Sequence, residues 1–144
     1  MKFISIVFSL SLSPLSLSEV TRISCGESKG YAYYFEGGLV KKEMSGFHED
    51  GITGGKFSLT LNDKNEADIL AIDATGTIKS ATSEGADVRA IPAGGAGFNW
   101  MAMHTDGTLE VYSWNATSNT VAAYRNTVGN PNIDKNSLFV SGCD

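Results

Sequence analysis

Two cysteines stand at opposite ends of the part of this 144-residue chain that we expect to fold, and no other cysteine lies between them. Cys25 follows an apolar leader, and Cys143 is the next-to-last residue. A single pair of this kind predicts one structural disulfide and an oxidising compartment, because thiols pair and stay paired there. We therefore expect one closed domain whose two ends are joined covalently.

The first eighteen residues have the layout of a secretory signal peptide: a lysine, an apolar stretch diluted by serine, and small residues before a cleavage site ahead of Glu19. The apolar stretch is too short for a transmembrane span. A buried N-terminal strand and a lipoprotein anchor at Cys25 are the alternatives, but Arg22 stands where a lipoprotein signal has an aliphatic residue. We expect a signal peptide over 1–18, a single β domain over 19–144, no membrane anchor, and a secreted or periplasmic location.

The charge balance of the chain excludes some classes of partner. Removing the 18 leader residues leaves 126 of 144 and takes the net charge from −5 to −6, since one of the 11 basic residues is lost. Nucleic acid and anionic membrane surfaces are not expected partners, because no cluster of lysine and arginine is present to neutralise phosphates. A domain of this size buries roughly two thirds of its unfolded surface, which is enough for one hydrophobic core.

The rest of the chain alternates short apolar–polar segments with turn-forming residues, which is the pattern of an all-β domain. In residues 57–61, for example, apolar and hydroxyl side chains alternate before the turn formers of 62–65. The other expected strands are 31–35, 68–73, 77–82, 86–91, 98–105, 108–115, 120–126 and 137–142. Eight or nine short antiparallel strands predict a single β-barrel or two-sheet sandwich, closed by one disulfide. Only 39–47 could hold a helical turn.

The strongest local signal is a hairpin in which Asp106 and Gly107 separate two apolar segments. An Asp-Gly pair favours a two-residue loop with a type I′ turn, which would place Thr105 opposite Thr108. The expected core face then carries Phe98, Trp100, Ala102, His104, Leu109 and Val111. The other face is unusually apolar for a solvent face, with Met101, Met103, Tyr112 and Trp114 beside Asn99 and Glu110. We expect this second face to contact another element or to line a binding site.

A second candidate site lies in residues 45–55, where one histidine and two carboxylates are interspersed with four glycines. A glycine-rich loop lets side chains approach a ligand closely. His48 and Asp50 are residue types that share a proton or bind a metal ion. However, the H-E-x-x-H zinc pattern is absent because position 52 is isoleucine, and the only other histidine, His104, lies in the predicted hairpin. We therefore expect neither a metal site nor a cofactor.

Two further motifs are better explained by structure than by chemistry. Residues 26–30 match the G-x-S-x-G pattern around Ser28, but that motif needs a strand-to-helix turn above a parallel sheet. A chain this short and β-rich does not supply one, so we expect a glycine-rich loop there. Asp63, Asn65 and Asp68 bring together oxygen ligands, but they lack the spacing and the glycine of a calcium-binding loop.

These features together favour a small exported, non-enzymatic binding module for an apolar small molecule or a protein surface. The candidate ligand-binding residues are Phe47, His48, Asp50, Met101, Met103, Tyr112 and Trp114. One alternative is a secreted inhibitor or surface-interaction protein that acts through the glycine-rich loop. The other is a small secreted hydrolase that uses His48 and Asp50, although the sequence carries no catalytic signature that favours enzymatic activity.

Overall fold

One long strand, β1 (Thr21–Tyr34), organises the structure, because other strands pair with it along both edges. On one edge it pairs with β10 (Lys135–Cys143). On the other edge, its first residues pair with β3 (Lys56–Leu61) and its later residues pair with β2 (Gly46–Ile52). All of these pairings are antiparallel, so β1 connects two parts of one sheet.

The structure is a computed structural model that describes residues 21–95 and 97–144. Its remaining strands are β4 (Ala67–Ile72), β5 (Ile78–Ser80), β6 (Asp87–Ala93), β7 (Gly97–Met103), β8 (Leu109–Asn115) and β9 (Thr120–Asn126). A short 3-10 helix, η1 (Lys42–Met44), precedes β2 and confirms the expected helical turn. The predicted signal peptide over 1–18 lies outside the described residues.

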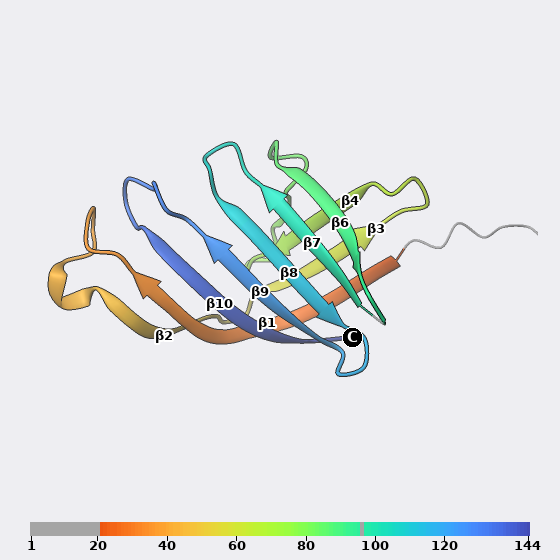
Figure 1. The fold of residues 1–144 in the computed structure, drawn as a ribbon, viewed down its shortest axis with the longest axis horizontal. Coiled ribbons are helices and arrows are strands. Elements are labelled where there is room, and N and C mark those ends of the chain that lie inside the picture. Colours follow the sequence, from red (N-terminus) through yellow and green to blue (C-terminus); the bar gives the residue numbers. More distant parts are fainter. Residues whose placement is uncertain (1–20, 96) are drawn as a thin grey trace, which may run out of the picture.

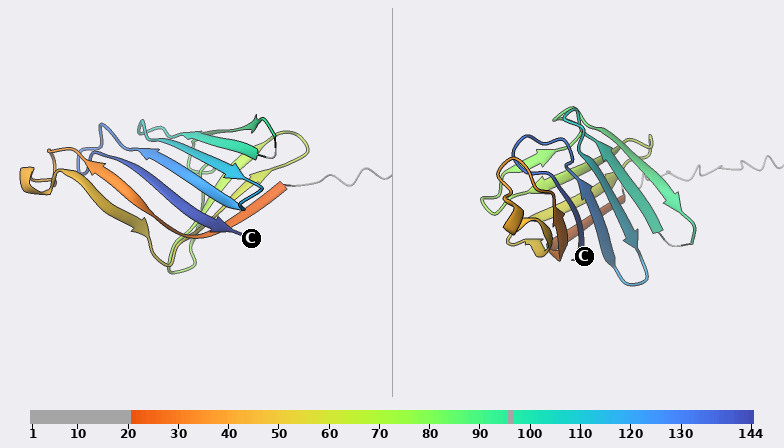
Figure 2. Two further views of the ribbon diagram at one scale, coloured as in Figure 1. Left: turned by 60° about the horizontal axis from the view of Figure 1, so that its bottom comes forward. Right: turned by 60° about the vertical axis from the view of Figure 1, so that its left-hand side comes forward.

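The ten strands form one antiparallel sheet with the order β5-β4-β3-β1-β10-β9-β8-β7-β6, and β2 pairs with β1 beside this series. The sheet curls into a half-barrel in which β3 and β4 lie across from β6–β8 (Figures 1 and 2). The predicted all-β, antiparallel fold closed by one disulfide is confirmed. Sequential strands pair in two meanders, one of β3–β5 and one of β6–β10, and β1 lies between them.

The additional strand is β2, which occupies most of the glycine-rich segment 45–55 that the sequence predicted to be a loop. The segment 26–30, also predicted to be a loop, lies inside β1. Glycine favours loops, but it also occurs in strands where two backbones approach closely. Gly30 is such a case, because a Cβ at this position would overlap the backbone carbonyl of Leu138 on the neighbouring strand.

The hairpin between β7 and β8 has a register one residue away from the predicted register. Its loop contains three residues, since the His104 N–H donates to the Thr108 carbonyl (2.9 Å) and the Gly107 N–H donates to the His104 carbonyl (3.1 Å). Such loops combine a type I turn with a residue in the left-handed region, and Gly107 has a φ of 87°. An Asp-Gly pair satisfies both turn types, so the sequence did not distinguish between them.

The change of register exchanges the two faces of β8, because successive side chains of a strand point to opposite sides. The inner face of the half-barrel carries Phe98, Trp100, Ala102, Glu110, Tyr112 and Trp114. The outer face carries Met101, Met103, Leu109 and Val111. The predicted grouping of Met101 and Met103 with Tyr112 and Trp114 is therefore wrong.

The hydrophobic core fills one end of the half-barrel, where β3 and β4 face β7 and β9. Trp100 has no exposed surface, and its indole N–H donates to the Thr60 carbonyl on the opposite wall at 3.0 Å. Leu59 and Val121 are equally buried and come from the two facing walls. Full burial of such side chains contributes roughly 1.5–3 kcal/mol each, so this core holds the curled sheet closed at that end.

Cys25 and Cys143 lie directly opposite one another on β1 and β10 and form the predicted disulfide. The two cysteines are 118 residues apart in sequence, so the bond closes a loop that contains almost every strand. The chain-entropy model gives about 5 kcal/mol for a loop of this length, which is an upper value because residual structure in the unfolded chain reduces it.

We predict that reduction of the disulfide lowers the free energy of unfolding by about 2–5 kcal/mol without loss of strand content. Denaturant titrations followed by far-ultraviolet circular dichroism, with and without reductant, measure both quantities. The Cys25→Ser/Cys143→Ser variant is the control, since its unfolding should be insensitive to reductant. Identical unfolding curves for the oxidised and reduced protein would contradict the prediction.

Candidate functional site

The inner face of the half-barrel contains a cavity of about 510 Å³ next to the core. Small-molecule sites usually occupy roughly 300–1,000 Å³, so this volume is sufficient for a ligand. The apolar side chains of the two facing walls include Phe57, Ile69 and Ala71 on one side and Tyr112, Ala123 and Phe139 on the other. The walls meet at the rings of Phe57 and Tyr112, whose centroids are 5.2 Å apart.

The inner face changes from apolar to charged over two neighbouring rows of residues, where a row consists of residues that lie opposite one another across successive strands. The apolar row contains Trp100, Tyr112, Ala123, Phe139 and Gly30. The next row contains Ala102, Glu110, Arg125, Ser137 and Ala32. The cavity lies along both rows and is therefore amphipathic, with charged groups on the side away from the core.

Glu110 is a buried carboxylate at the centre of a polar cluster in the second row. It accepts a hydrogen bond from the Tyr112 hydroxyl (3.2 Å) and lies 3.0 Å from Nε of Arg125. The His104 Nε2 atom lies 3.5 Å from this carboxylate and has no hydrogen-bond partner among the described residues. Burial, together with the neighbouring Glu110 charge, raises the pKa of the Tyr112 hydroxyl, which therefore stays protonated and donates.

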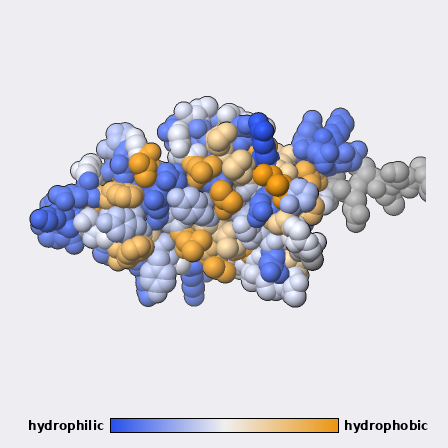
Figure 3. Space-filling view, viewed as in Figure 1, coloured by the Kyte–Doolittle hydropathy of each residue, from blue (hydrophilic) through white to orange (hydrophobic). Residues whose placement is uncertain are grey.

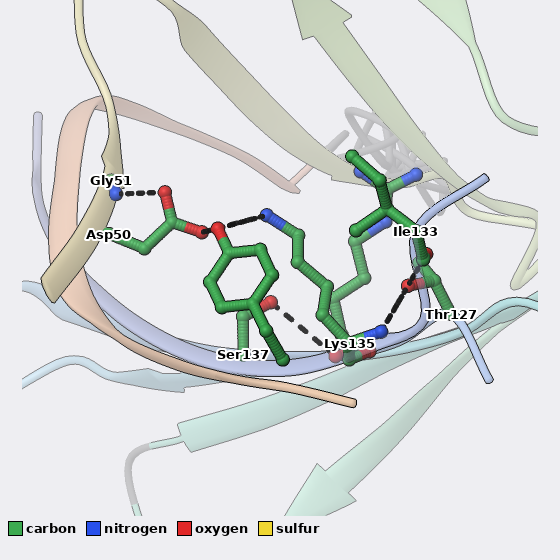
Figure 4. A network of polar contacts seen from close by, with 8 residues as sticks. Asp50, Gly51, Thr127, Ile133, Lys135 and Ser137 are labelled. Carbon is green, nitrogen blue, oxygen red and sulfur yellow. Dashed lines mark hydrogen bonds and ion pairs between the residues drawn. The ribbon is translucent and has the colours of Figure 1, made fainter. Parts of the chain in front are cut away.

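A second polar cluster joins β2 to β10 across β1 (Figure 4). The ammonium of Lys135 lies 2.7 Å from the Asp50 carboxylate, and the Tyr34 hydroxyl donates to the same carboxylate oxygen at 2.8 Å. The Gly51 N–H donates to the other oxygen at 2.8 Å. Burial alone would raise the pKa of Asp50, but the hydrogen bonds from Lys135, Tyr34 and Gly51 stabilise the charged form and hold this pKa below its usual value.

The structure places two of the seven predicted ligand-binding residues, Asp50 and Tyr112, on the cavity wall. His48 lies two residues before Asp50 on β2, but its side chain is exposed and does not line the cavity. No hydrogen bond or ion pair connects His48 to Asp50 in the described part of the chain. Trp114 is on the inner face, where it packs against the core and donates to the Asn119 side chain at 3.3 Å.

The other three predicted residues, Phe47, Met101 and Met103, lie on the outer face, on the opposite side of the sheet from the cavity. Phe47 is 78% exposed and packs edge-to-face against Tyr33, with ring centroids 5.0 Å apart. A row of apolar residues crosses this face and contains Tyr31, Leu138, Tyr124, Val111 and Met101. Apolar side chains gather over the middle of the sheet in Figure 3, so the outer face is a separate apolar surface.

Sequence reasoning missed the charged residues of the cavity, of which Glu110, Arg125 and Lys135 are the most important. Glu110 could have been identified, because the Asp-Gly pair also allows a three-residue hairpin loop, which places this carboxylate on the inner face. A buried carboxylate there needs a charged or hydrogen-bonding partner. Arg125 supplies that partner from the facing position on β9. Lys135 gave no comparable signal, since its partner Asp50 lies 85 residues away in sequence.

Within residues 21–95 and 97–144, no group of three or more histidine, cysteine, aspartate or glutamate side chains is arranged to hold a metal ion. No helix in the same residues has the length and apolar character needed to span a membrane. Comparison of the chain with family models, with curated protein sequences and with solved structures gives no match. The functional argument therefore depends on the cavity and on its polar clusters.

The lowered pKa of Asp50 predicts a pH-dependent contribution to stability. A carboxylate with a lowered folded-state pKa stabilises the protein above its unfolded pKa of about 3.9, and this contribution is lost as the pH falls through the folded-state pKa. At pH 7, Asp50→Asn should therefore lower the free energy of unfolding by about 1–2 kcal/mol. Denaturant titrations between pH 7 and about pH 3 should show this difference shrinking below about pH 4.

The matched control for this experiment is Asp63→Asn, since Asp63 is exposed in a turn and its side chain makes no hydrogen bond among the described residues. Its effect on the free energy of unfolding should be small, because the substitution removes no side-chain hydrogen bond among the described residues. A constant difference between Asp50→Asn and the unmodified protein over the whole pH range would contradict the stabilising role of the ionised carboxylate.

A different prediction concerns the cluster around Glu110. Glu110→Ala removes the acceptor of the buried Tyr112 hydroxyl and the partner of Arg125, so it should lower the free energy of unfolding by about 2–3 kcal/mol. The exposed Glu43 of η1 is the control, because Glu43→Ala should change the free energy of unfolding by less than about 0.5 kcal/mol. Equal effects of the two substitutions would show that the cluster does not contribute to stability.

Proposed function

We propose that this protein is an exported, non-enzymatic binding module that holds a small, mainly apolar molecule in the cavity of its half-barrel. The observation that carries the proposal is the cavity itself, which has apolar walls on two sides and a small number of convergent polar groups. This combination is typical of small-molecule sites, where apolar contacts provide affinity and a few polar groups fix orientation. The disulfide and the predicted leader support export.

The walls of the cavity are held in place before any ligand arrives. Phe57 and Tyr112 contact one another across it, and the Trp100–Thr60 hydrogen bond joins the same two walls in the adjoining core. A site that is already formed loses little conformational entropy on binding, so more of the apolar contact energy contributes to affinity. Burial of apolar surface contributes roughly 25 cal/mol per Å², and this cavity offers such surface on both sides.

The arrangement of possible catalytic groups favours binding over hydrolysis. Nucleophilic catalysis needs a nucleophile and a base within hydrogen-bond reach of one another. The hydroxyl of Ser28 is buried and has no hydrogen-bond partner among the described residues, and Asp50 is engaged by Lys135 rather than by His48. The polar groups of the cavity therefore support an orienting role.

The experiment fills the cavity and measures the binding of a neutral apolar dye, Nile red, by its fluorescence. Ala71 is exposed and lines the cavity, so Ala71→Trp should occupy the dye's space and weaken its binding by about tenfold or more, which corresponds to about 1.4 kcal/mol. Ala122→Trp is the control, because Ala122 is exposed on the outer face beside Val140.

The two variants also separate the cavity from the outer apolar surface as the place of binding. Weaker binding by Ala71→Trp alone supports the cavity. Weaker binding by Ala122→Trp alone would assign the dye to the outer surface and would favour contact with a protein instead. If the unmodified protein fails to bind the dye at all, the proposed function is wrong.

A further inference from the structure

Four carboxylates line the cavity, and two of them, Asp50 and Glu110, have little capacity left to accept hydrogen bonds; the other two are Asp73 and Glu84. Asp50 accepts from Lys135, Tyr34 and Gly51, and these three donors use both of its oxygens. Glu110 has the Tyr112 hydroxyl and the Arg125 Nε as close donors, with Nε2 of His104 at 3.5 Å. An additional polar group beside Asp50 and Glu110 therefore meets few free acceptors.

The donors of the cavity, in contrast, are not all used. A guanidinium has five N–H groups, and the single contact of Arg125 to a described acceptor is the one from its Nε to Glu110. The Arg125 side chain is 50% exposed and lines the cavity. On the facing wall, the exposed Lys79 lies in the same inner row as Phe57 and Ala71 and lines the cavity, and its side chain makes no hydrogen bond or ion pair within the described residues. Beside Glu110, the free hydrogen-bonding capacity is thus that of the Arg125 guanidinium, which is cationic and of donor type.

The position of Arg125 relative to the apolar row adds a geometric argument. Arg125 and Ala123 are on the same face of β9, two residues apart, and a strand rises about 3.3 Å per residue. The apolar row with Ala123 and Phe139 therefore begins roughly 7 Å below the Arg125 backbone, on the side toward the core. A ligand that contacts both Arg125 and the apolar row therefore has its polar end beside Arg125 and its apolar body nearer the core.

We propose that the ligand is an amphiphile with an acidic headgroup, a carboxylate or a phosphate monoester, that binds the free N–H groups of Arg125 while its apolar body lies against Phe57, Ala123 and Phe139. The inference rests on the proposed function, since it assigns both ends of the ligand to the same cavity. The planar guanidinium suits this role, because its paired N–H groups match the oxygens of a carboxylate or a phosphate. Lys79 adds one positive charge from the opposite wall, and Asp73 and Glu84 also line the cavity.

The test compares four compounds that share a decyl body and differ in their heads: decanoate, decyl phosphate, decan-1-ol and decyltrimethylammonium. Each is titrated as a competitor of Nile red, below its micelle concentration. The two acids should bind roughly ten- to hundredfold more tightly than decan-1-ol, which is the range for charge-assisted hydrogen bonds. The preference should decrease with salt, because Arg125 is half exposed. The tighter of the two acids identifies the headgroup.

Arg125→Gln should reduce the preference for the acids to within about threefold of decan-1-ol, because the free N–H fork is lost. Arg89→Gln is the matched control, since Arg89 lies on the outer face of β6 and pairs with Asp87. A second variant, Glu110→Gln/Arg125→Gln, removes both charges of the pair together, and it should show the same loss of preference without leaving a buried charge unpaired.

Each failure has a distinct meaning. Nile red binding with equal affinity for the acids and decan-1-ol overturns the headgroup assignment and leaves the proposed function intact. A preference for the acids that persists in both Arg125 variants also overturns it, because another cation must then hold the head. Absence of Nile red binding to the unmodified protein overturns the proposed function itself.

Discussion

The structure depends on the way in which β1 is shared between two parts of the sheet. Its first half pairs with β3 and its second half with β2, while β10 follows the opposite edge. The register with β10 shifts between Cys25 and Ser28, and such irregularities bend a strand and increase its twist. Because one strand serves both parts, the sheet folds back on itself, and the core and the cavity both lie inside the resulting curve.

The charges inside the cavity show how the protein avoids the cost of burying them. A lone buried carboxylate is strongly unfavourable, but Glu110 and Asp50 each have a basic partner and a tyrosine hydroxyl. Pairs of this kind contribute little net stability compared with apolar residues of the same size. The orienting role that we propose for these groups would account for paired charges next to an apolar surface.

The parts of the fold that follow from local sequence were predictable. Strand alternation identified most segments, and two cysteines left one possible disulfide. The failures came from local patterns that fit two structures: an Asp-Gly pair suits loops of two or three residues, and the glycines around His48 suit a loop or a strand. The cavity was not predictable, because Arg125 and Lys135 meet their partners only after distant strands have been placed side by side.

The strand order leaves β5 and β6 as the two ends of the curled sheet, with no hydrogen-bonded ladder between them. Pro92 and the charged pair of Asp87 and Arg89 on β6 oppose pairing with another strand. The gap between these ends is therefore spanned mainly by side-chain contacts, which resist separation much less than a ladder does. The half-barrel is kept closed across this gap by packing of the core and by contacts such as the hydrogen bond from the Trp100 side chain to the Thr60 carbonyl, so its closure depends on the core residues themselves.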